Sequence, residues 1–181
     1  MTYDFKNKFS LLDTNILKEM IEETRRSEQF RPAFEFLKEQ ETVPFVLDAT
    51  AFEFAGYSAN KKDYDRRLSL IREFGPSSPV TSEDIEMATR LSAMYKCKSH
   101  SINPSQISYI DCLHAAQLVR FKERAFIVTT DVNDYPSFLF DTSKVIAIDE
   151  EAGRTIFVAF KTYNQEKMTK LVSRFDSSGA F

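Results

Sequence analysis

Short apolar runs alternate along the chain with longer segments in which apolar residues recur at helical spacing. The short runs are partly β-branched and are bounded by polar or turn-forming residues, as buried strands are. They predict strands at Phe9–Leu12, at Pro44–Leu47, in a short segment beginning at Val80, and at Ala125–Thr129, Lys144–Ile148 and Thr155–Tyr163.

The segments between these runs predict helices, several of which have recognisable ends. Apolar residues from Ile16 to Ile21 follow helical spacing, and Pro32 suits the first turn of a helix that reaches Glu39. One further helix is expected after a cap at Asp48 or Thr50, and another over Lys61–Phe74. A helix capped by Thr81 or Ser82 should reach about Cys97, and one that starts at Pro104 or Ser105 should reach about Lys122. The last helix is expected over Gln165–Phe175. Glu83 and Asp84 would then lie in a first helical turn, where the dipole favours anions.

This alternation is typical of an α/β domain whose mostly parallel sheet is covered by helices on both faces. The chain of 181 residues contains no repeat, low-complexity tract or linker, so we expect residues 1–181 to form a single domain. In such sheets ligands bind at the carboxyl ends of the strands. The residues that follow the predicted strands are therefore the first place to look for chemistry.

Composition and charge narrow the class of protein. Hydrophobic residues make up 43% of the chain and charged residues 28%, which are globular values. No apolar run is long enough to span a membrane, and we expect a cytoplasmic protein. The formal net charge of −3 argues mildly against a nucleic-acid binder, but binding needs only a local basic patch.

Acidic residues stand where strands end or where helices begin. Asp13 closes the first strand in LLDTN and is equally well interpreted as a helix cap. Glu53 lies in the helix after the second strand, on a face that also holds Ala49 and Gly56, and taken alone it is more simply a solvated residue. Asp111 shares a helical stripe with apolar residues, where a carboxylate is unfavourable unless it is paired or binds a cation.

Asp131 and Asp134 follow the strand AFIVTT, where turn formation is the alternative interpretation. Carboxylates gathered at one edge of a sheet would repel each other and raise each other's pKa, and a divalent cation would relieve this repulsion. Mg²⁺ and Mn²⁺ prefer oxygen ligands and activate water next to phosphate groups. The acids therefore predict a Mg²⁺ or Mn²⁺ site that hydrolyses phosphodiester bonds.

The motifs LLDTNIL, FEFAG, SYIDCLHAA and VTTDVNDYP occur in the order, and in the strand and helix context, of the PIN-domain family. The chain resembles that family over Leu11 to about Tyr135. The resemblance implies a three-layer α/β/α sandwich with a mostly parallel central sheet, with a helical insertion around residues 60–100 and a C-terminal extension around 150–181. It also implies Mg²⁺- or Mn²⁺-dependent endoribonuclease activity on RNA.

Carried over by position, the resemblance assigns roles to individual residues. The catalytic, metal-binding acids would be Asp13, Glu53, Asp111 and Asp131, with Asp134 as an auxiliary acid; Asn15 would orient Asp13, and Thr129 would support the centre through its hydroxyl. The resemblance is also compatible with a role as the toxin of a toxin–antitoxin pair, in which an antitoxin protein binds the chain. It is compatible with a homodimer as well.

Basic residues cluster in segments that could hold an RNA backbone, although charged helix faces are more often simply solvated. The clusters are Lys61, Lys62, Arg66 and Arg67, then Arg120, Lys122 and Arg124, with a third strip of Lys161, Lys167, Lys170 and Arg174. A zinc site from Cys97, His100, Cys112 and His114 is disfavoured, because Cys112 and His114 would point to different sides of one helix. We expect His114 to be a partly buried structural residue near Asp111.

Two other interpretations remain open. A non-catalytic PIN-like module that binds RNA or protein would keep the fold without turnover, although every motif position retains its acid. A metal-dependent phosphatase or DNA nuclease would use the same acids on another phosphate ester.

Overall fold

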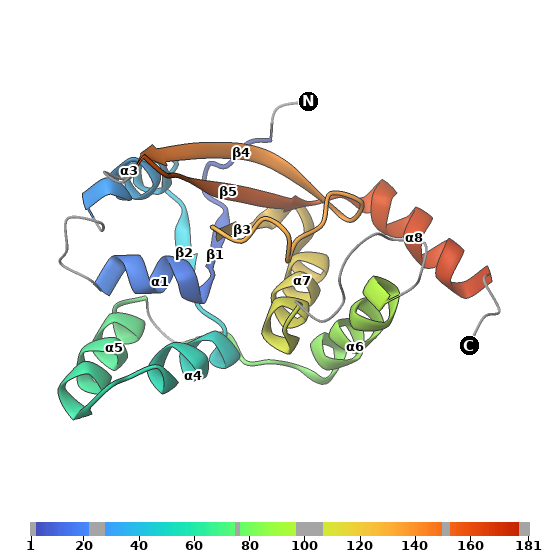
Figure 1. Ribbon diagram of the computed structural model, residues 1–181. Coiled ribbons are helices and arrows are strands. Elements are labelled where there is room, and N and C mark those ends of the chain that lie inside the picture. The colour runs from blue at the N-terminus through green and yellow to red at the C-terminus, as the bar shows by residue number, and fades with distance from the viewer. Residues whose placement is uncertain (1–2, 22–27, 75–76, 97–106, 150–152, 178–181) are drawn as a thin grey trace.

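The computed structural model describes residues 3–21, 28–74, 77–96, 107–149 and 153–177, and within them it has a central sheet between two layers of helices (Figure 1). The strands are β1 (Phe9–Leu12), β2 (Val43–Phe45), β3 (Ala125–Thr129), β4 (Phe140–Asp149) and β5 (Thr155–Tyr163). They lie in the order β2-β1-β3-β5-β4. The described chain thus has the predicted α/β/α sandwich.

The sheet is parallel at its centre and antiparallel at one end. β1 pairs in parallel with both β2 and β3, whereas β5 runs antiparallel to β3 and to β4. β5 is therefore the reversed strand, and the other described strands share one direction, as the prediction of a mostly parallel sheet requires. The carboxyl ends of β1, β2 and β3 meet at one edge.

Alternating side chains divide the core into two clusters, one on each face of the sheet. Leu11 and Ile127 face the first cluster, whereas Leu12, Phe126 and Val128 face the second. The first is covered by α6 (Ser82–Lys96), α7 (Tyr109–Phe121) and α8 (Gln165–Ser177); the second is covered by α1 (Thr14–Ile21), α3 (Arg31–Glu39), α4 (Asp48–Gly56) and α5 (Lys61–Glu73). None of the described helices is long and apolar enough to cross a membrane.

Several predicted boundaries are wrong, for local reasons. β2 is shorter than predicted, because Leu47 leaves it to bridge Ser78, and Val80 begins no strand. The cap residue of α4 is Leu47, which makes no side-chain cap hydrogen bond, rather than Asp48 or Thr50.

Two further boundaries differ because hydrogen bonding, and not apolar content, sets the ends of the elements. α7 begins at Tyr109, after Ser108 as its cap. The predicted start at Pro104 or Ser105 lies outside the described residues. β4 begins at Phe140 rather than Lys144, because its polar first residues pair with the end of β5 across a bulge.

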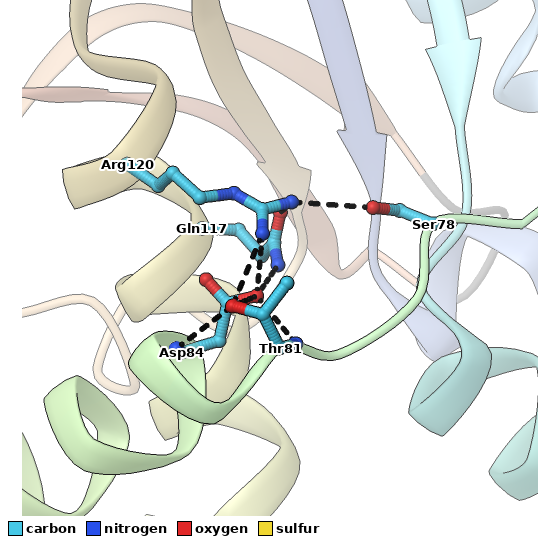
Figure 2. Close-up of polar contacts among 5 residues, drawn as sticks. All are labelled: Ser78, Thr81, Asp84, Gln117 and Arg120. Atoms are coloured by element: carbon cyan, nitrogen blue, oxygen red, sulfur yellow. Dashed lines mark hydrogen bonds and ion pairs between the residues drawn. The ribbon is translucent and has the colours of Figure 1, made fainter.

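An ion pair with a buried carboxylate fixes α6 against α7 (Figure 2). Asp84, which is 2% exposed, accepts hydrogen bonds from Gln117 at 2.7 Å and Arg120 at 2.8 Å through the same carboxylate oxygen. Thr81 caps α6 by accepting a hydrogen bond from the Asp84 N–H, and Arg120 reaches Ser78 at 3.4 Å. Because α7 also carries Asp111, this network holds one of the predicted site residues in place through its helix.

Candidate metal centre

Asp13 follows β1 directly and is 6% exposed. Its Oδ2 accepts hydrogen bonds from the Thr129 hydroxyl at 2.6 Å and from the Asn15 amide at 2.9 Å. Asn15 Oδ1 in turn accepts a hydrogen bond from the Thr130 N–H, at the end of β3. These are the contacts that the predicted supporting roles of Asn15 and Thr129 require. Two parallel neighbours, β1 and β3, thus fix the orientation of one carboxylate.

Asp111 lies in the first turn of α7 and is 8% exposed. One of its oxygens, Oδ2, accepts a hydrogen bond from the Ser108 N–H at 2.8 Å, while the Ser108 hydroxyl accepts one from the Asp111 N–H. This capping box explains how the buried carboxylate is tolerated at the start of the helix. Among the described residues, no hydrogen bond is made to its Oδ1.

His114 is fully buried, not partly buried as expected, and stands beside the two acids. One ring nitrogen of His114 and one carboxylate oxygen from each of Asp13 and Asp111 lie within 4.8 Å of one another. Nε2 is 2.7 Å from the Thr50 hydroxyl and Nδ1 is 3.0 Å from the Tyr135 hydroxyl. Since both ring nitrogens already have partners, His114 is better suited to packing the site than to binding a cation.

Glu53 extends from α4 toward the same centre and is half-buried. It accepts a hydrogen bond from the Thr14 hydroxyl, in the first turn of α1. Its charge raises the pKa of Asp13 and opposes the effect of burial on His114, so Glu53 is close to both groups. Thr14, Thr50 and Tyr135 were not predicted as site residues, although Thr14 stands next to Asp13 in the LLDTN motif.

Asp131 and Asp134 border the centre on the loop after β3. Asp131 is exposed, and its Oδ1 accepts a hydrogen bond from the Asn133 N–H at 3.2 Å, as the turn interpretation required. Asp134 is partly buried, and burial together with the charges of Asp111, Asp131 and Asp13 raises its pKa to about 7. The loop therefore adds two carboxylates to the buried pair.

Asp13 and Asp111 belong to a group whose ligand atoms are close enough together to hold a metal ion. Burial raises the pKa of Asp13 and of Asp111, and the charge of Asp13 raises that of Asp111 further. No Lys or Arg of the described residues forms an ion pair with either carboxylate. A cation bound between them would favour the charged forms. A donor set made of carboxylate oxygens fits Mg²⁺ or Mn²⁺.

The first two of the predicted basic clusters lie in different regions of the fold, and the third lies on β5 and α8. Lys61, Lys62, Arg66 and Arg67 lie on α5, which packs against α4 and so lies near Glu53. Lys61 is paired with Asp65 and Arg67 with Asp63. Lys122 and Arg124 lie in the turn before β3, at the end of the sheet opposite the acids. The guanidinium of Arg120 forms an ion pair with Asp84.

The pKa of Asp134 predicts a dependence of stability on pH. Between its ordinary pKa of 3.8 and about 7, this carboxyl is protonated in the folded state and ionised in the unfolded state. The unfolded state then binds fewer protons, so stability falls as pH rises through that range. In chelator, we expect the thermal midpoint of the wild type to fall relative to that of Asp134→Asn as pH increases over this window.

His114 acts in the opposite direction, because burial lowers its pKa to about 4 from 6.5, so stability is lost as pH falls through that interval. It is present in both proteins, and the comparison between them removes its contribution. Thermal melts from acidic to neutral pH measure the difference directly, and parallel curves for the two proteins would contradict the placement of Asp134.

One comparison with known proteins gives a match. A family model described as PIN domain matches residues 10–133, which is more than half of the chain and includes all the acids described above except Asp134. Neither the curated proteins nor the solved structures include a significant match.

Proposed function

The chain belongs to the PIN-domain family, whose members are generally nucleases, and from this premise we propose that it is a metal-dependent endoribonuclease. The observation that carries the proposal is the buried pair of Asp13 and Asp111 at the carboxyl edge of the sheet, whose charges no basic side chain of the described residues compensates. Buried charges persist where they are paired or bind a cation.

Each acid has a role in the proposed reaction. Asp13, Glu53, Asp111 and Asp131 hold Mg²⁺ or Mn²⁺, and Asn15 and Thr129 keep the Asp13 carboxylate in one orientation. When bound, the cation lowers the pKa of water and stabilises negative charge on the phosphate. Asp134 is the auxiliary acid beside them, on the loop after β3.

Neutral groups around the acids exclude water and limit movement. His114 stays uncharged at neutral pH, because its burial lowers its pKa to about 4. It links Thr50 of α4 to Tyr135 of the loop after β3. The proposed role of His114 is to keep these elements together around Asp111. A toxin role, an antitoxin and a homodimer stay predictions from the family resemblance.

A panel of substrates tests the proposal. The purified chain would be incubated with single-stranded RNA, single-stranded DNA and a phosphate monoester, each with Mn²⁺, with Mg²⁺ and with chelator. We expect cleavage within the RNA chain in Mn²⁺ or Mg²⁺ and none in chelator. Gel analysis of the products separates internal cleavage from release of terminal nucleotides.

The other outcomes identify the rival functions. Metal-dependent cleavage of DNA alone would indicate a DNA nuclease, and release of phosphate from the monoester would indicate a phosphatase. Folded protein that cuts none of these substrates, and that Mn²⁺ does not stabilise against heat, would favour the non-catalytic module, since a ligand stabilises only a state that binds it.

A further inference from the structure

Tyr95, in the last turn of α6, carries a buried hydroxyl that has no hydrogen-bond partner among the described residues. The residue is only 2% exposed, and its ring packs edge-on against Phe138 with the two ring centroids 6.1 Å apart. Most buried polar side-chain atoms are hydrogen-bonded, because an unpaired one loses its bonds to water without replacement. Phenylalanine would fill the same space without that loss, so the hydroxyl needs an explanation in its surroundings.

The acids of the candidate metal centre act on this hydroxyl. α6 packs beside α7 (Figure 1), and Tyr95 shares a core cluster with Cys112, the neighbour of Asp111 in the chain. Burial raises the pKa of the Tyr95 phenol well above its ordinary value, and the charges of Cys112, Asp111 and Asp134 raise it further. The phenol therefore keeps its proton at neutral pH and can donate a hydrogen bond to a carboxylate.

Tyr135 shows how a second phenol is satisfied in the same surroundings. It is fully buried, and burial together with the charges of Asp13, Asp111 and Asp134 raises its pKa. Its hydroxyl is 3.0 Å from His114 Nδ1, so it has a neutral partner within the protein. The hydroxyl on α6 lacks such a partner among the described residues, and the acids are the polar groups that act on it.

We propose that Tyr95 is a positioning residue of the metal centre, whose hydroxyl donates a hydrogen bond to the Asp111 carboxylate, directly or through one bridging water. The charge of Asp111 acts on Tyr95 more strongly than that of Asp134 does. Of the two Asp111 oxygens, the Ser108 N–H holds Oδ2. A second donor from α6 would keep the carboxylate in the orientation that binds a cation, because hydrogen bonds to charged acceptors are strong. The inference rests on the proposed metal-dependent function.

Tyr95→Phe tests this role, because it removes the hydroxyl and keeps the ring. In chelator we expect the variant to melt at the temperature of the wild type or above it, since phenylalanine leaves no unpaired polar atom. In calorimetric titration its affinity for Mn²⁺ should fall roughly tenfold, as the loss of one hydrogen bond to a charged group predicts. Mg²⁺ should induce a smaller ultraviolet difference signal from tyrosine in the variant, because phenol absorption responds to the hydrogen bond that the hydroxyl donates.

Tyr3→Phe is the matched control. The Tyr3 hydroxyl donates to the carbonyls of Glu123 and Ala125, at the end of the sheet opposite the acids. This control should melt below the wild type and bind Mn²⁺ equally well. A lower melting temperature of Tyr95→Phe in chelator would show a purely structural hydroxyl and overturn the proposal.

The remaining outcomes separate the role of Tyr95 from the proposed function. Equal Mn²⁺ affinity of Tyr95→Phe and wild type, with metal-dependent RNA cleavage by the wild type, would reject the role of Tyr95 alone. Weaker Mn²⁺ binding by Tyr95→Phe, with no RNA cleavage by the wild type, would support the role of Tyr95 and reject the nuclease function alone. A folded wild type that binds no Mn²⁺ would overturn both.

Discussion

Replacing Asp111 by asparagine is expected to lower metal-dependent RNA cleavage by roughly a hundredfold or more, equivalent to about 3 kcal/mol of transition-state stabilisation. Asparagine keeps an oxygen that can accept the hydrogen bond from the Ser108 N–H, so the capping box survives. It replaces the other carboxylate oxygen, Oδ1, with an amide N–H₂, which cannot bind a cation. Single-turnover cleavage in Mn²⁺ measures the loss.

Ser108→Ala separates the two roles of the first turn of α7, which are to cap the helix and to present the Asp111 carboxylate to a cation. It removes the hydroxyl that accepts the Asp111 N–H and leaves the acid in place. Loss of such a cap lowers stability by about 1 kcal/mol. We expect this variant to melt at a lower temperature and to retain cleavage when folded. Asp111→Asn that cleaves RNA like the wild type would remove Asp111 from the metal centre.

Asp84→Ala is expected to produce the largest loss of stability. It leaves Gln117, which is fully buried, and the Arg120 guanidinium without their shared acceptor (Figure 2). Breaking a buried ion pair costs about 3–5 kcal/mol, and because the Arg120 side chain is 33% exposed we expect about 2–3 kcal/mol. For a domain of this size the thermal midpoint should fall by roughly 5–10 °C.

Asp176→Ala is the matched control, because it also removes an aspartate from an arginine pair. Asp176 and Arg90 are 57% and 37% exposed, and surface pairs contribute about 0–1 kcal/mol. Calorimetric or spectroscopic melts of both variants give the comparison. Equal midpoints for the two would show that the Asp84 network adds no more than a surface contact.

The fold could be predicted where periodicity and end signals agree. β1, β3 and β5 begin and end at the predicted residues, because each is mainly apolar and has polar residues beyond both of its ends. β4 was predicted too short, since its first residues are polar and are recruited by pairing with β5. A bridge such as that between Leu47 and Ser78 depends on residues far apart in sequence and leaves no local pattern.

The candidate site was predictable only in part. Its acids stand at strand ends or share a stripe with apolar residues, and those are signals in the sequence. The packing around them is not: His114 has its position because α7 faces both Thr50 and Tyr135. The pairing of Arg120 could not be predicted either. The sequence placed Arg120 in a basic cluster and gave no sign that Asp84 binds its guanidinium.

The central claim is that the buried acids bind a divalent cation. Calorimetric titration of the metal-free protein with Mn²⁺ at pH 7.5 tests it most directly, with Asp111→Asn and Ser108→Ala measured beside the wild type. The account predicts saturable binding by the wild type and by Ser108→Ala, and binding by Asp111→Asn that is weakened at least tenfold or lost. No binding by folded wild type, or equal binding by all three proteins, would contradict it.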